Sequence, residues 1–123
     1  MRDYLEIYKK FDDVKDVKEY IDEVNKLRDY YKSNQYEKMN EHINELTQKY
    51  VFETIVWNIV NPYMPITYEQ SYQNAENFMC AKGAQLIISK VIDYASRLSQ
   101  EEQEFIVLQT KSMEWLWIST EKR

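Results

Sequence analysis

The stretch FMCAKGAQLI, residues 78–87, holds the only cysteine and the only glycine of the chain, three positions apart. Plotted at about 100° per residue, the apolar face of a helix through this stretch shifts by roughly a quarter to a third of a circle. Either Gly83 ends a helix as a left-handed C-cap, or the helix continues and its small residues admit a close neighbour. Since no polar loop residues follow Gly83, the sequence favours one continuous helix, which opens after Thr67 and runs to Leu98.

Cys80, the cysteine of this stretch, lacks the neighbours that a nucleophilic thiol needs. Activation requires a base or a cation beside the sulfur. The only histidine, His42, is predicted to lie on the polar side of a different helix, and Lys82 is two residues away, which on a helix points it elsewhere. We therefore predict a buried, inert thiol. A single cysteine cannot form an internal disulfide, so a reducing compartment is expected.

The composition predicts an all-α fold in a single domain over residues 1–123. The chain has 1 glycine and 2 prolines in 123 residues, which is too few for the turns of a β-sheet protein. Apolar residues recur every three or four positions, as on the buried faces of helices. One such stripe consists of Tyr36, Met39, Ile43, Leu46 and Tyr50. We predict a helical bundle of five or six helices with a long, largely buried central helix.

Local signals mark the helix boundaries. Ser33 and Asn34 mark a turn, and the two prolines of NPYMP, residues 61–65, cannot continue a helix. Two capping boxes, in which a Ser or Thr pairs with a Glu or Gln three positions later, open helices. They are Thr67 with Gln70 and Ser99 with Glu102. The second box opens the last helix, which is expected to end by about Thr120.

The charge and hydropathy of the chain argue against two kinds of partner. The formal net charge is -5, and lysine and arginine are scattered without a basic block, so direct nucleic-acid binding is not expected. The longest apolar region, YVFETIVWNIV at residues 50–60, contains Glu53 and Asn58 and is too short to span a bilayer. The first residues have no apolar core of the signal-peptide type. We expect an acidic, cytoplasmic protein without membrane contact.

No catalytic constellation is present in the sequence, and we expect no catalytic residues, no cofactor and no metal. The chain lacks a phosphate loop, a zinc-ligand spacing and a Ser-His-Asp set. Glu37, Glu41 and Glu45 form a ladder along one helix face beside His42. A di-iron bundle would need Glu-x-x-His motifs on two helices, and lysines interleave with this ladder as on a solvated face.

Aromatic residues make up 15% of the chain, with 11 tyrosines and 3 tryptophans. More than half of the tyrosines are expected in the core, and those on apolar stripes are Tyr4, Tyr8, Tyr31, Tyr36 and Tyr68. The excess is typical of a protein-binding surface, where tyrosine and methionine bury a large area at low entropic cost. We place that surface in the proline-stiffened turn and the helix after it, where Tyr68 and Tyr72 are open to either interpretation, with one further tyrosine on the second helix. The predicted partner-binding residues are Tyr63, Met64, Tyr68, Tyr72 and Tyr30.

These features favour a non-catalytic protein that binds and inhibits or regulates a larger macromolecular partner, most simply a protein. Lysine outnumbers arginine twelve to four, as in AT-rich genomes, and this bias fits an inhibitor of a host or defence protein carried by a phage or mobile element, in the class of anti-CRISPR proteins. The alternative is a magnesium-dependent all-α nucleotide pyrophosphohydrolase. Its helix-borne carboxylates would be Glu101 with Glu104, or Glu19 with Asp22.

Two segments are apolar on more sides than one short bundle covers. They are VFETIVWNIV, residues 51–60, and FIVLQTKSMEWLWI, residues 105–118. We expect at least one of them to be shared with a second copy of the chain, in a two-fold homodimer.

Overall fold

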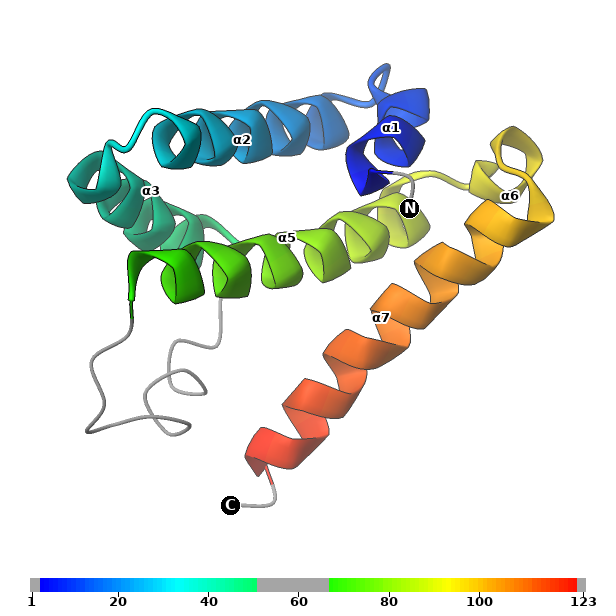
Figure 1. Ribbon diagram of the computed structural model, residues 1–123. Coiled ribbons are helices and arrows are strands. Elements are labelled where there is room, and N and C mark those ends of the chain that lie inside the picture. The colour runs from blue at the N-terminus through cyan, green and yellow to red at the C-terminus, as the bar shows by residue number, and fades with distance from the viewer. Residues whose placement is uncertain (1–2, 51–66, 122–123) are drawn as a thin grey trace. The chain divides into compact units, whose positions relative to one another are not determined.

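The computed structural model describes residues 3–50 and 67–121, and this part of the chain contains six α-helices and no strand (Figure 1). The all-α, helical-bundle class and the predicted helix number are confirmed. The prolines of NPYMP and the segment VFETIVWNIV lie outside the described residues. The elements are α1 (Tyr4–Tyr8), the 3₁₀ turn η1 (Lys9–Phe11), α2 (Lys15–Lys32), α3 (Tyr36–Lys49), α5 (Tyr68–Lys90), α6 (Tyr94–Arg97) and α7 (Gln100–Glu121).

The chain divides into two compact units. The first comprises described residues within 1–22 and 79–123, and the second those within 23–78. The first unit therefore contains α1, η1, the beginning of α2, the end of α5, α6 and α7. The second contains the rest of α2, α3 and the beginning of α5. That the chain forms one domain over residues 1–123 stays a prediction.

Helix α5 passes through Gly83 without a break, as the sequence favours, because two tyrosine rings occupy the space beside this residue. A Cβ atom at Gly83 would lie 2.5 Å from Cε2 of Tyr8 and 2.6 Å from Cζ of Tyr20. The Tyr8 hydroxyl donates to the backbone oxygen of Cys80 over 2.7 Å, and the Tyr20 hydroxyl donates to the backbone oxygen of Met79. Both rings are fully buried. Cys80 itself is half-buried, so the prediction of a buried thiol is wrong.

The core of the first unit is apolar and comes from every element except α6, which has no buried residue. Besides the two tyrosines, its buried residues are Leu5, Ile7, Phe11, Val17, Ile21, Met79, Ala81, Ala84, Ile87, Val91, Leu98 and Ile106. Burial of such side chains contributes about 1.5–3 kcal/mol each relative to exposure, which is the main stabilising term of the unit.

Helix α5 ends at Lys90, not at Leu98, so the predicted end is wrong. A continuous helix would carry Leu98 about 12 Å beyond Lys90 along the axis. Instead the chain turns into the short helix α6, and Leu98 is buried. Arg97 donates to the Asp13 carboxylate over 2.7 Å and lies 5.4 Å from the centre of the Phe11 ring. These long-range contacts stabilise the break.

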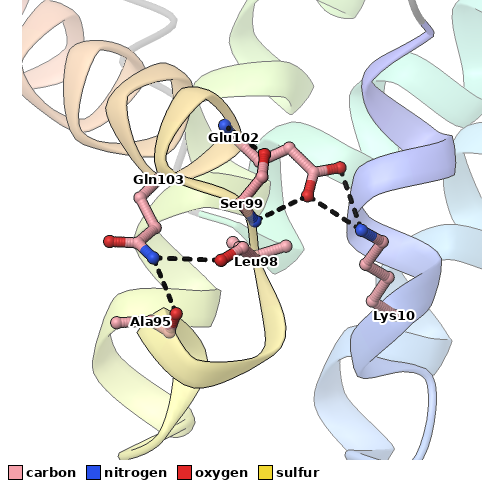
Figure 2. Close-up of polar contacts among 6 residues, drawn as sticks. All are labelled: Lys10, Ala95, Leu98, Ser99, Glu102 and Gln103. Carbon is pink, nitrogen blue, oxygen red and sulfur yellow. Dashed lines mark hydrogen bonds and ion pairs between the residues drawn. The ribbon is translucent and has the colours of Figure 1, made fainter.

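The capping box at the start of α7 forms as predicted, and Figure 2 shows its contacts. The Ser99 hydroxyl accepts from the Glu102 amide over 3.2 Å, and the Glu102 carboxylate accepts from the Ser99 amide over 3.0 Å. The same carboxylate binds Lys10 of η1, with distances of 2.8 and 3.0 Å from Nζ to its two oxygens. Gln103 donates to the backbone oxygens of Ala95 and Leu98. Glu102 therefore both caps α7 and ties it to η1.

At the other predicted box, Thr67 accepts from the Gln70 amide over 3.1 Å, so this hydroxyl caps α5.

In the second unit the core includes a histidine. His42 is only 2% exposed, so its predicted place on the polar side of its helix is wrong. Its Nε2 atom lies 3.0 Å from the backbone oxygen of Glu23 on α2, and the Tyr30 ring meets its ring edge to face. His42 takes the place in the apolar stripe that the sequence suggests for Ile43, which is half-buried. The buried residues of this unit are Val24, Leu27, Met39, His42, Leu46, Tyr50 and Ala75.

Replacing Gly83 by alanine should lower the free energy of unfolding by up to about 2 kcal/mol. The added methyl group would overlap two buried rings, at a cost of about 1–3 kcal/mol, and the better helix propensity of alanine offsets about 1 kcal/mol of that. Urea denaturation measures the change. The loss should shrink in a Tyr20→Leu background, which removes one of the two rings. A stabilised Gly83→Ala protein would contradict the close contact, since helix propensity alone predicts that sign.

Glu102→Ala should lower the free energy of unfolding by about 2 kcal/mol, because it removes the helix cap and leaves Lys10 without its carboxylate. Glu101→Ala is the matched control, since Glu101 is exposed one position earlier in the same turn. It should change the free energy by no more than about 0.5 kcal/mol. Equal losses in the two variants, measured by thermal or urea denaturation, would show that neither the cap nor the Lys10 contact contributes to stability.

Candidate partner-binding surface

Four tyrosines from three helices of the second unit form one stacked group, the tyrosine cluster. Its members are Tyr31 on α2, Tyr36 on α3, and Tyr68 and Tyr72 on α5. The rings of Tyr31 and Tyr72 are parallel within 5°, with centres 3.9 Å apart, and those of Tyr36 and Tyr68 lie at 12° and 4.8 Å. The two stacked pairs meet where the Tyr31 and Tyr36 rings pack at a tilt, 6.1 Å apart. Such ring contacts contribute about 0.5–1.5 kcal/mol each beyond simple burial.

The turn between α2 and α3 brings Tyr31 and Tyr36 together. Asn34 has a positive φ of 62°, the left-handed conformation that asparagine tolerates better than most residues. The Gln35 amide donates to the Tyr30 oxygen and the Asn34 amide to the Tyr31 oxygen, which is the hydrogen-bond pattern of a Schellman helix end. The Asn34 side chain also accepts from the Tyr36 hydroxyl over 2.7 Å. One asparagine thus ends α2 and orients a ring of the cluster.

On α5, the spacing of four residues places Tyr68 and Tyr72 on the same face of the helix. Tyr68 is the first residue of α5 and is 47% exposed, whereas the other three rings are half-buried. The Tyr72 hydroxyl donates to Glu76 over 2.7 Å, and the same carboxylate accepts from Arg28 of α2 over 2.7 Å. The cluster therefore has one exposed ring and a polar edge that holds a second ring in place.

The surroundings raise the pKa of two of these phenols. Burial is the main cause at Tyr72, and the hydrogen bond to Glu76 and the charge of that carboxylate add to it. At Tyr31 burial is again the first cause, followed by the charge of Glu69. Both rings are therefore neutral at physiological pH and present uncharged aromatic faces.

The structure joins only some of the predicted partner-binding residues. Tyr68 and Tyr72 come together, but Tyr63 and Met64 lie outside the described residues. Tyr30 packs against His42 instead, and Lys26 lies 6.0 Å from its ring centre beside a shallow, open depression. None of the ring contacts described places Tyr30 in the cluster.

The apolar stripes predict Tyr31 and Tyr36 in the core, whereas in the structure both rings are half-buried in the cluster. The sequence predicts that Tyr31 and Tyr36 lie near each other, because they flank the Ser33–Asn34 turn and such a turn brings flanking residues together. Their stacking on α5, however, is a contact between segments far apart in the sequence, and helix periodicity does not report it.

Within residues 3–50 and 67–111, no three His, Cys, Asp or Glu side chains are grouped closely enough to hold a metal ion. The carboxylates of the predicted magnesium pairs, Glu101 with Glu104 and Glu19 with Asp22, are all exposed. Over the same residues, none of the helices combines the length and the apolar character required to cross a membrane.

Comparison with protein-family models, with curated proteins and with solved structures finds no match to this chain. Its function is therefore inferred from the chemistry of its own side chains.

Tyr72 should ionise above the ordinary tyrosine pKa of 10.0, because both its burial and Glu76 favour the neutral phenol. A pKa that is raised in the folded state contributes stability that is complete below about pH 10 and is lost as the pH rises through the folded value. The free energy of unfolding should therefore fall above about pH 10. Tyrosinate absorbance and urea denaturation at several alkaline pH values measure the two effects.

In the Tyr72→Phe variant the late-ionising population should decrease by one tyrosine, and the loss of stability at alkaline pH should be smaller. A Tyr72→Phe variant that keeps the whole late-ionising population and loses its tyrosine from the ordinary one would show that the Glu76 contact is absent in solution.

Proposed function

We propose that this chain is a non-catalytic helical protein that binds a larger macromolecular partner, most simply a protein, and inhibits or regulates it. The observation that supports the proposal is the tyrosine cluster. It gathers four large rings, leaves Tyr68 47% exposed and keeps the other three half-buried. Tyrosine is enriched at the centres of protein interfaces because its ring buries a large area and its hydroxyl stays hydrogen-bonded.

The cluster is suited to binding because its rings are already ordered. Stacking restricts Tyr31 and Tyr36 on one face each, and hydrogen bonds to Asn34 and Glu76 orient two of the hydroxyl groups. A surface that is ordered before binding loses less conformational entropy when the partner docks. The exposed ring of Tyr68 would then be the contact that a partner covers first.

The charge of the chain favours a partner with basic groups. The formal net charge is -5, and Glu37 and Glu69, next in sequence to two cluster tyrosines, are exposed. Lysine or arginine side chains on the partner could pair with these carboxylates and lie over the open ring of Tyr68. An inhibitor of a host or defence protein, of the kind that phages and mobile elements carry, is a class that fits a chain of this size and charge.

Tyr68→Ala should weaken binding of the partner by about 1–3 kcal/mol, a loss of about 5- to 150-fold in affinity, without unfolding the chain. The partner is first identified by affinity capture with the unmodified chain from a lysate of low-GC bacteria, and its affinity for each variant is then measured by calorimetry. Tyr94→Ala is the matched control, a tyrosine outside the cluster, and should bind as the unmodified chain does. Circular dichroism establishes that both variants are folded.

Two results would count against the proposal. A partner that binds the folded Tyr68→Ala variant as tightly as the unmodified chain would move the interface elsewhere. Robust hydrolysis of a nucleotide with magnesium, abolished by Glu101→Gln or Glu104→Gln, would replace binding by the alternative enzymatic function.

A further inference from the structure

Helix α7, part of the first unit, carries a narrow exposed stripe of four residues. They are Glu104, Val107, Leu108 and Lys111, all of them exposed, and we call them the α7 stripe. At 100° per residue the four positions fall within an arc of about 100° on one side of the helix. Leu108 is 64% exposed and Val107 37%, so the middle of the stripe presents apolar surface to water.

The two charged residues of the stripe lie at equal distances on either side of its centre and carry opposite charges. Glu104 lies three and a half positions before the midpoint between Val107 and Leu108, and Lys111 lies three and a half positions after it. The two charges are about 10 Å apart along the helix axis, which is too far for them to pair with each other. Neither makes an ion pair or hydrogen bond with any other described residue.

We propose that α7 pairs with α7 of a second copy, antiparallel, about a two-fold axis between Val107 and Leu108. In this arrangement Glu104 of each copy lies opposite Lys111 of the other, and the apolar pairs of the two copies meet at the axis. An isologous interface must be complementary to itself, and the α7 stripe meets that condition in both charge and hydropathy. The proposal goes beyond the binding function above and does not rest on it, because the tyrosine cluster belongs to the other unit.

The charge pattern selects both the occupant and the direction of pairing. A parallel pair of α7 helices in register would place Glu104 against Glu104 and Lys111 against Lys111, which is repulsive. Only a second copy is bound to carry the complementary order of charges, because a two-fold interface pairs the same surface with itself. Four side chains from each copy bury less than the roughly 1,200 Å² of a standard interface, so we expect a weak dimer whose population depends on concentration in the micromolar range.

The test is sedimentation equilibrium of the full chain at neutral pH and low salt, from low micromolar to near-millimolar concentration. The unmodified chain should form dimers. Glu104→Lys and Lys111→Glu should each raise the dimer dissociation constant by about tenfold or more, because each variant turns two attractive contacts into repulsive ones. Glu41→Lys makes the same charge change at an exposed position in the middle of α3 and should leave the dissociation constant unchanged.

Mixing the two single variants tests whether the stripes of the two copies face each other, and the double variant tests the antiparallel direction. The Glu104→Lys chain has two positive charges on its stripe and the Lys111→Glu chain has two negative ones, so an equimolar mixture should form heterodimers. The double variant Glu104→Lys with Lys111→Glu restores the complementary pattern and should dimerise as the unmodified chain does. Circular dichroism establishes that every variant is folded.

Three outcomes would overturn the proposal. The first is an unmodified chain that stays monomeric at all concentrations, including the case in which the stripe instead binds the foreign partner. The second is a dimer that neither single variant weakens, which would place the interface on another face. The third is a mixture of the two single variants that fails to associate, which would exclude the antiparallel register.

Discussion

The contact between two tyrosine rings and the backbone of α5 organises the first unit. At Gly83 the helix presents no side chain, and the rings of Tyr8 and Tyr20 fill the space that a side chain would occupy. Their hydroxyl groups bind the backbone oxygens of Cys80 and Met79, which lie three and four residues before Gly83. The same turn of α5 therefore receives both the apolar faces and the polar ends of these rings. Since Tyr8 and Tyr20 belong to α1 and α2, this one turn positions the start of the chain.

Ion pairs in the same unit also connect the start of the chain to its later helices. Lys10 and Asp13, just after the first helix, bind Glu102 and Arg97, which lie more than eighty residues further along the chain. Glu102 is only 5% exposed, so its contact with Lys10 is shielded from water, whereas the Asp13–Arg97 pair is more open. The partly buried pair should contribute more to stability than the exposed one, because solvent screens exposed ion pairs strongly.

The sequence predicts the features of this fold that depend on neighbouring residues. Ser99 and Glu102 form their capping box because each satisfies the backbone amide of the other, and this interaction needs no third segment. The end of α5 is different, since Arg97 contacts Asp13 across the fold and helix periodicity carries no record of that contact.

The sequence does not predict the burial of His42 or the stacking of Tyr31 on Tyr72, for the same reason in both cases. Each depends on which helix lies opposite, and a single sequence gives the face of a helix more reliably than it gives the neighbour of that face. The sequence therefore predicts only half of the tyrosine cluster. Helical spacing places Tyr68 and Tyr72 together, but it does not predict the rings that stack on them.

The position of Tyr68 at the very start of α5 couples ring packing to the order of the helix end. Terminal turns of helices fray because their first amides lack partners within the helix. Here Tyr36 holds the first residue of α5 by stacking, and Thr67 caps the amide of Gln70. A molecule that binds the Tyr68 ring would also stabilise this turn in its helical form. Its binding would therefore slow the exchange of the amide protons at the start of α5.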